Sequence, residues 1–238
     1  QRQYLDFLRN LLKDQEYAAL AYMTGILPVK KYGKHSALNM FREYSMTNQK
    51  VLEEYTGFIE AEVKGLCEKY DMDFAKTSGW YDGYMFKSYR HIYNPKSVVE
   101  AMTCRDFSNY WTSTETYEAL KIYIDMDFDG LRPDIVQMLG GGRVRVNTRS
   151  FQNDMRSFRT KDDVLTLLIH LGYLGYDSIA EEAFIPNKEI IGEFENAMSV
   201  GGWSEVMRVL KASEQLLEDT LRGDAVRVAE GLDKAHTE

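Results

Sequence analysis

Apolar residues recur every three or four positions along most of the chain, which is the spacing of an amphipathic helix. The first such run extends from Gln3 to Asp14, with Tyr4, Phe7 and Leu11 on one side. The same spacing predicts further helices over residues 48–55, 59–70, 73–81, 114–123, 131–139 and 162–171, and two more within 204–234.

Local signals mark where several helices begin or end. Asn94 can accept a hydrogen bond as an N-cap, and Pro95 fits the first helical position. Pro186-Asn187 opens another helix, which carries Ile190, Ile191 and Phe194. In the tail, Gly223 ends one helix and Asp224 caps the next.

Three segments depart from the helical spacing. Residues Arg143 to Asn147 alternate, which predicts a strand, and Tyr173–Ile179 with Ala183–Ile185 predicts a hairpin. Tyr17 to Thr24 is an apolar run that predicts a short buried strand, although its alanines are also compatible with a helix. The sequence therefore predicts a mostly α fold with minor β structure. From residue 131 to 185, the order helix, strand, helix, hairpin is that of a winged-helix unit.

Composition and charge narrow the class of protein. A hydrophobic content of 44% with 28% charged residues is typical of a globular chain, and the net charge of −8 disfavours a protein that coats nucleic acid. Two distant cysteines, Cys67 and Cys104, predict free thiols rather than a disulfide framework. No apolar run approaches the ~20 residues of a membrane span. These features favour a cytoplasmic protein without membrane contact, and the absence of an initial Met indicates an excerpt from a longer chain.

The chain offers little chemistry of its own. Residues 125–130 imitate the start of a calcium loop, but the twelfth position is Val136 rather than Glu, so no metal site is expected. No phosphate-binding loop of the form G-x-x-x-x-G-K-[ST] is present, nor an apolar strand that ends in Asp-Glu. The four histidines show no ligand spacing, and His170 is expected in a core. We find no nucleophile–base pair and expect no catalytic residue in this chain alone.

Basic residues gather after the predicted strand. They are Arg143, Arg145, Arg149, Arg156, Arg159 and Lys161. Such a cluster beside a winged helix suits nucleic-acid phosphates. However, Asp162-Asp163 starts the presumed recognition helix and Glu181-Glu182 lies at the tip of the presumed wing. Carboxylates at both positions would repel DNA, so a solvated or interdomain face is the favoured interpretation.

Seven blocks of the sequence, in order, resemble successive signatures of a bacterial AAA-ATPase-like family. Members of this family commonly carry a C-terminal PD-(D/E)XK-type nuclease domain. The blocks are ALAYMTGILPVKKYGKHSALNMF, WYDGY, YNPKSVV, FSNYWT, FDGLRPDIVQML, KDDVLTLLIHLGYLGYD and IPNKEI. The resemblance covers nearly the whole chain, but it includes neither the P-loop nor the nuclease.

The resemblance implies four parts. They are the end of an α/β ATPase core (1–46), a helical lid (47–125), a winged-helix-like domain (126–199) and linker helices (200–238). It also implies two partners in the same protein, the missing P-loop half and the nuclease domain. ATP and Mg would be the cofactors of the intact ATPase, with their ligands mostly outside this chain.

The same resemblance suggests nucleotide-sensing residues. Thr24 would end a sensor strand and bond the γ-phosphate or its attacking water, while Gly25 lets the backbone turn away. Lys30 or Lys31 would approach the phosphates, and Asn94-Pro95 would start a lid helix against the adenine. The residues alone also allow a simpler interpretation, in which Thr24 caps a sheet, the lysines are solvated and Asn94 only caps its helix.

Two other functions stay open at this point. The chain could be a nucleic-acid- or protein-binding module built on the winged helix, without its own catalysis. It could also be a scaffold that has lost activity.

Overall fold

The computed structural model describes residues 2–27, 40–111, 120, 124, 130–149, 151, 158–200 and 204–237. Within these residues the chain is mostly helical, with two small antiparallel sheets, as predicted. The helices are α1 (Arg2–Leu12), the 3-10 helix η1 (Lys50–Tyr55), α2 (Glu60–Tyr70), α3 (Phe74–Tyr81), α4 (Pro95–Cys104), α6 (Leu131–Leu139), α7 (Lys161–His170), α8 (Lys188–Val200), α9 (Ser204–Arg222) and α10 (Ala225–Thr237).

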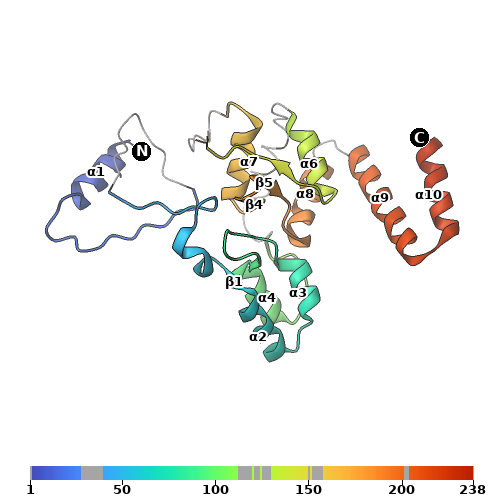
Figure 1. Ribbon diagram of the computed structural model, residues 1–238, viewed down its shortest axis with the longest axis horizontal. Coiled ribbons are helices and arrows are strands. Elements are labelled where there is room, and N and C mark those ends of the chain that lie inside the picture. Colours follow the sequence, from blue (N-terminus) through green and yellow to red (C-terminus); the bar gives the residue numbers. More distant parts are fainter. Residues whose placement is uncertain are drawn as a thin grey trace.

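Residues 50–111 form what we call the helical unit, which lies at the bottom of the view in Figure 1. Helices α2, α3 and α4 enclose a core that includes Val63, Cys67, Tyr81, Val98 and Met102. The short strands β1 (Phe58–Ile59) and β2 (Ile92–Tyr93) pair antiparallel beside it. The helices predicted over 59–70, over 73–81 and after Asn94 are confirmed, while the segment predicted as a helix over 48–55 contains the 3-10 helix η1. Cys67 is a buried free thiol.

Residues 130–200 form what we call the strand unit. Its elements follow the order α6, β3 (Val144–Arg145), α7, β4 (Gly175–Asp177), β5 (Glu182–Phe184) and α8. The sheet has the order β3-β5-β4 and both pairings are antiparallel, so the predicted hairpin is confirmed. Helix α7 is buried from Asp163 to His170, because α6, α8 and the sheet contribute to one core around it.

Two arms extend from these units on opposite sides of the molecule (Figure 1). One arm is α1 with the coil that follows it. The other is the hairpin of α9 and α10, which turns at Gly223 with φ of 73°. Asp224 Oδ1 accepts a hydrogen bond from Arg227 N at 3.2 Å, so the predicted break and cap in the tail are confirmed.

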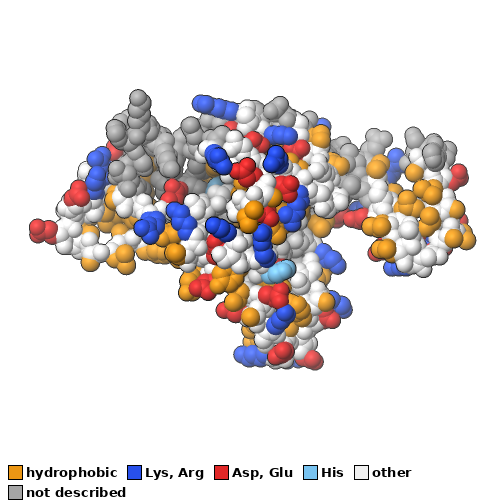
Figure 2. Space-filling view, in the orientation of Figure 1, with side chains coloured by type: hydrophobic (Ala, Val, Ile, Leu, Met, Phe, Trp, Pro, Cys, Tyr) orange, Lys and Arg blue, Asp and Glu red, His pale blue; other side chains and the backbone are white. Residues whose placement is uncertain are grey.

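Hydrophobic side chains are exposed on both arms. Figure 2 shows them gathered over the α9–α10 hairpin and along the N-terminal arm. The exposed residues of the hairpin include Val209, Leu217, Leu221, Val226 and Leu232.

The buried strand predicted over residues 17–24 is wrong for this structure. The segment is an exposed coil in which Leu20 is 90% and Tyr22 is 82% exposed. A strand needs a neighbour that satisfies its backbone hydrogen bonds, and no strand in the described part of the chain pairs with this segment.

Other predicted elements fall partly outside the described residues. The helix expected over 114–123 is one of them, although Leu120 and Ile124 are helical and buried. The calcium-like segment at 125–129 also lies outside. In the described ranges, no helix has both the length and the apolar character that crossing a membrane requires.

Candidate functional site: a polar junction between the two units

The predicted nucleotide-sensing residues lie on separate parts of the molecule. Thr24 and Gly25 are exposed in the N-terminal coil, whereas Asn94 and Pro95 start α4. Figure 1 shows that the N-terminal coil and α4 are apart, so the described structure does not assemble these residues into one pocket. Lys30 and Lys31 lie outside the described residues.

The predicted cap of α4 is confirmed. Asn94 Oδ1 accepts hydrogen bonds from the backbone N–H groups of Lys96 at 3.0 Å and Ser97 at 3.4 Å. Pro95 occupies the first turn, where its missing N–H costs nothing. Capping alone therefore explains why this sequence stands here, and a nucleotide contact requires separate support.

The basic cluster is partly neutralised by neighbouring carboxylates. Three ion pairs are formed: Arg143 with Asp177 at 3.7 Å, Arg149 with Glu181 at 2.8 Å, and Lys161 with Asp134 at 2.8 Å. Arg145 and Arg159 are exposed, and Arg156 lies outside the described residues. A helix that reads a groove needs an exposed face, and α7 is buried over most of its length. These contacts favour a solvated or interdomain role for the cluster.

A network of buried and partly buried polar contacts lies elsewhere, where the helical unit packs against α8. Residues from four of the sequence blocks meet there: WYDGY, YNPKSVV, FSNYWT and IPNKEI. We call this region the junction and define it by Asp82, Ser97, Asn109, Tyr110, Asn187, Glu189 and Glu193. Blocks far apart in the sequence thus form one contiguous site.

Glu189 is the centre of the junction. Its side chain is 1% exposed, although it lies in the first turn of α8. Its Oε2 accepts a hydrogen bond from Ser97 Oγ at 2.8 Å, and its Oε1 accepts one from Tyr110 N at 2.7 Å. Burial raises the pKa of this carboxyl, while the hydrogen bonds from Ser97 and from the Tyr110 and Trp111 backbones oppose the increase.

Glu193 lies one turn further along α8 and is also 1% exposed. Asn109 Nδ2 donates a hydrogen bond to its Oε1 at 2.6 Å. Burial raises the pKa of Glu193, and the Asn109 contact opposes this. The same Asn109 amide lies 3.3 Å from the backbone oxygen of Glu189, so one side chain of the helical unit contacts two turns of α8.

Asn187 fixes the start of α8 against the helical unit. Its Oδ1 accepts a hydrogen bond from Ile190 N at 3.1 Å, and its Nδ2 donates to the backbone oxygen of Asp82 at 2.8 Å. Gly83, which follows Asp82, has φ of 115° and lies against the Pro186 backbone. A Cβ atom at this position would overlap the Pro186 backbone. This position therefore requires glycine.

An aspartate–histidine pair lies at the edge of the junction. His91 Nδ1 is 2.6 Å from Asp82 Oδ2, and the other carboxylate oxygen of Asp82 is buried without a hydrogen bond in the described part of the chain. Ser78 Oγ donates a hydrogen bond at 3.4 Å to Asp82 Oδ2, the oxygen that also faces His91, rather than to the histidine. Ser78, His91 and Asp82 are therefore not arranged as a catalytic triad, in which the serine would contact the histidine and the aspartate would orient it.

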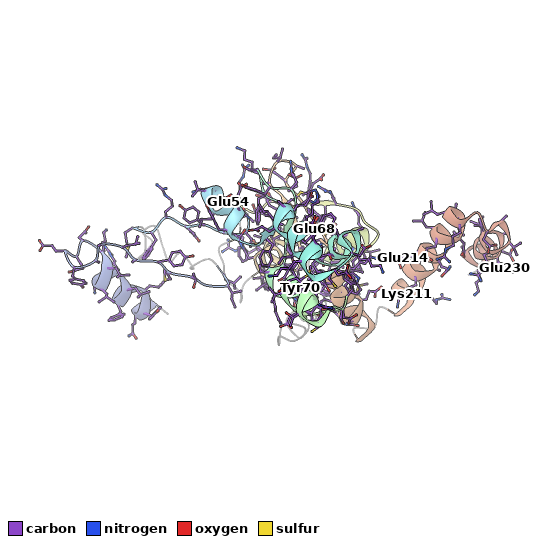
Figure 3. The ribbon with its side chains drawn as sticks, turned by 90° about the horizontal axis from the view of Figure 1, so that it is seen from below. Glu54, Glu68, Tyr70, Lys211, Glu214 and Glu230 are labelled. Carbon is purple, nitrogen blue, oxygen red and sulfur yellow. The ribbon has the colours of Figure 1, made fainter. Side chains whose placement is uncertain are left out.

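A hollow of about 480 Å³ opens beside the junction, between α3, α8 and α9. Trp80, Asn109, Lys188, Gly192, Glu195 and Glu214 contribute to its lining. Figure 3 labels Glu214 on α9. The size is that of a small-molecule site, but a lining with one lysine and two glutamates favours no single class of ligand.

The contacts of the junction are hydrogen bonds between the helical unit and α8. Among the described residues, no three His, Cys, Asp or Glu side chains are placed to hold a metal ion. His170 lies in the core with its pKa lowered to about 4 by burial, as expected for a core histidine. The site provides a set of buried and partly buried hydrogen bonds that join the two units.

Comparison with protein-family models, with curated proteins and with solved structures finds no match.

Apart from Asn187, which the sequence indicates as the start of a helix, the residues of the junction were not predicted from the sequence. One signal for them exists: Glu189 and Glu193 are spaced four apart on the same side of a helix as Ile190, Phe194 and Ala197, which are buried. Charged residues on the apolar face of a helix are rarely left without partners.

Proposed function

We propose that this chain is the non-catalytic, nucleotide-responsive part of an AAA-like ATPase that couples ATP binding to an attached nuclease domain. In this proposal, the helical unit is the lid and the strand unit is a winged-helix-like domain. The observation that carries the proposal is that four of the blocks resembling the family meet at the junction. Such a joint would move the two units together.

The topology of the strand unit supports the winged-helix part of the proposal. The elements α6, β3, α7, β4 and β5 follow in the expected order. The first strand pairs with the last strand of the hairpin, giving the sheet order β3-β5-β4. This arrangement places the hairpin turn, with Glu181, at one edge of the unit.

The exposed N-terminal arm supports the proposed partner. Its large apolar side chains include Tyr4, Phe7, Tyr17, Leu20, Tyr22 and Ile26, all of them more than half exposed. An apolar surface of this extent is typical of a segment covered by another domain. A P-loop half of the same ATPase would cover it, and that half would hold ATP and Mg.

The test uses the complete protein, with the P-loop half and this chain on one polypeptide. The affinity for a non-hydrolysable ATP analogue is measured by calorimetry for the wild type and for Thr24→Ala. We expect binding to weaken about tenfold, which is the effect of one lost hydrogen bond to a charged group. Thr220→Ala, the same change on an exposed helix, is the control. Unchanged affinity and hydrolysis in Thr24→Ala would remove the sensor assignment.

The alternative, a nucleic-acid-binding module, has less support. Three members of the basic cluster are paired with carboxylates, and α7 is buried. A protein-binding role without catalysis is compatible with the exposed α9–α10 hairpin, but no described contact indicates which partner would bind there.

A further inference from the structure

Helices α9 and α10 contact each other along one side of each helix. A Cβ atom at Gly231 would lie 3.0 Å from Leu216 Cδ1, and Asp219 Oδ1 lies 3.9 Å from Arg227 Nη1. These contacts fix the rotation of both helices, because successive residues are about 100° apart around a helix. Asp219 is the one buried side chain in the described part of the hairpin, so the two helices enclose almost no core.

The two helices share one apolar face outside this contact. On α9, Leu217 is 60% and Leu221 is 79% exposed, and on α10 Leu232 is 49% exposed. Ala225 and Ala229 are also exposed and continue the stripe of Leu232 at helical spacing. Measured from the contact between the helices, both stripes turn to the same side of the hairpin, over which Figure 2 shows hydrophobic side chains gathered. We call this surface the hairpin face and define it by these five residues.

The charged side chains nearest to the hairpin face are carboxylates. By the same helical spacing, Glu214 lies along the outer edge of α9 and Asp233 along the outer edge of α10. Glu218 follows Glu214 by one turn and is paired with Arg222 at 3.2 Å. The basic residues of the hairpin lie on the side away from the face, and they are Arg208, Lys211, Arg222, Arg227 and Lys234. The hairpin face is therefore apolar with an acidic rim, formed by Glu214 and Asp233.

The acidic rim distinguishes among the partners that an apolar surface can bind. A second copy of this chain, packed face to face, would place its own Glu214 and Asp233 against the same residues, and like charges repel. Anionic lipid headgroups and nucleic-acid phosphates are repelled by the same carboxylates. Lysine and arginine side chains are attracted to them, so the charge of the rim favours a basic protein partner.

The shape of the hairpin face favours a helix as the bound segment. A third amphipathic helix that packs against an antiparallel pair gives all three helices a shared core. Helix α9 has 19 residues and is about 28 Å long, so a partner helix of about 18 residues would cover the face. A helix bound in such a groove contacts it through apolar residues three and four positions apart.

We propose that the hairpin face binds an amphipathic helix of a partner protein, in which lysine or arginine residues flank the apolar stripe. Leu217 and Leu232 contact the stripe, while Glu214 and Asp233 pair with the basic flanks. The hairpin face is separate from the junction, and its partner is independent of the nucleotide in the proposed function.

The test uses two labelled peptides of about 18 residues, the length that matches α9. Both have leucine at the same helical positions, and the polar positions are lysine in one peptide and glutamate in the other. Fluorescence anisotropy measures their binding to the chain. We expect the Leu/Lys peptide to bind and the Leu/Glu peptide not to bind. Leu217→Asp should weaken binding by at least about tenfold, the effect of removing a central apolar contact.

Leu20→Asp is the matched control for the apolar contact. It makes the same change on the N-terminal arm, where Leu20 is 90% exposed, and it should leave the affinity for the Leu/Lys peptide unchanged. The rim is tested by the double variant Glu214→Lys with Asp233→Lys. This variant should bind the Leu/Lys peptide about tenfold more weakly, as expected for the loss of two exposed ion pairs, and should now bind the Leu/Glu peptide.

Two results would overturn the proposal. One is a Leu/Lys peptide that does not bind, or that binds equally well to Leu217→Asp, because attraction to the acidic chain as a whole would then explain any binding. The other is a dimer of the chain alone in sedimentation that Leu217→Asp dissociates, because a second copy would then occupy the face. The comparison of the two peptides on the wild type needs no variant, and Leu217 and Glu214 are exposed, so their substitution leaves the core unchanged.

Discussion

At the scale of single residues, the two buried glutamates of α8 look alike but have different surroundings. Glu189 accepts hydrogen bonds from the Ser97 hydroxyl group and from the Tyr110 and Trp111 backbones, whereas Glu193 accepts one from Asn109. An amide has one accepting oxygen. It can replace the carboxylate at Glu193. At Glu189 its oxygen can accept from the Tyr110 backbone only if its NH₂ group faces Ser97, whose hydroxyl group then loses the carboxylate oxygen that accepted its hydrogen bond.

We therefore predict that Glu189→Gln and Glu193→Gln have unequal effects on stability. The free energy of unfolding should fall by about 1–3 kcal/mol in Glu189→Gln, the cost of an unsatisfied buried donor. Glu193→Gln should change it by less than about 1 kcal/mol, because the Asn109 contact is kept and a buried charge is removed. Urea unfolding at pH 7 measures both. Equal losses would contradict the hydrogen-bond assignment.

His170 makes the free energy of unfolding depend on pH. Burial lowers its pKa to about 4 from an ordinary value of 6.5, so the folded chain binds this proton less tightly than the unfolded chain. Unfolding is then favoured as the pH falls below 6.5, and the loss levels off near the folded pKa. The full contribution is about 3 kcal/mol.

The prediction is that the free energy of unfolding decreases between pH 6.5 and pH 5 in the wild type, and that His170→Gln reduces this decrease. Urea unfolding at several pH values provides the measurement, and the imidazole resonances of His170 should keep their neutral shifts over the same range. An imidazole that titrates near pH 6.5 would show that the ring is not buried as described.

At the scale of elements, the structure follows the sequence wherever the signal is local. Helix α6 has the bounds that its apolar spacing predicts, and Asn94 caps α4 as its side-chain chemistry predicts. The segment 17–24 differs, because an apolar run becomes a strand only where another strand pairs with it. The junction also could not be predicted from local signals, because the partners of Glu189 and Glu193 are about eighty to ninety positions away in the sequence. Spacing within α8 cannot identify them.

The turn after α3 allows a direct test of how closely the two units approach. Gly83→Ala should destabilise the protein by at least about 3 kcal/mol, because it combines a positive φ with overlap against the Pro186 backbone. Gly65→Ala, in α2 with no atom near the added methyl group, should instead stabilise the helix by up to about 1 kcal/mol. Thermal unfolding of both variants gives the comparison. A mild effect at Gly83 would mean that the units are not in contact there.

At the scale of the whole molecule, the net charge and the burial of α7 disfavour binding to nucleic acid. The net charge is −8, three members of the basic cluster are ion-paired, and α7 has little exposed surface. What the molecule exposes instead is apolar surface on two arms, on either side of the joined units (Figures 1 and 2). Contacts with other protein domains suit such a surface better than contacts with phosphates.

We accordingly predict that the chain binds duplex DNA no more tightly than about 10⁻⁴ M at physiological salt, the weak end of non-specific binding. Fluorescence anisotropy with a labelled duplex, at low and at physiological salt, is the measurement. Arg145 and Arg159 are the two described basic residues of the cluster that are exposed and lie outside its three ion pairs. Arg145→Glu and Arg159→Glu should therefore leave the affinity for the duplex unchanged if the chain binds no groove. Tight binding with a steep salt dependence that both variants reduce would reverse the conclusion. The strand unit would then act through its surface charge, and the junction would serve to present that surface.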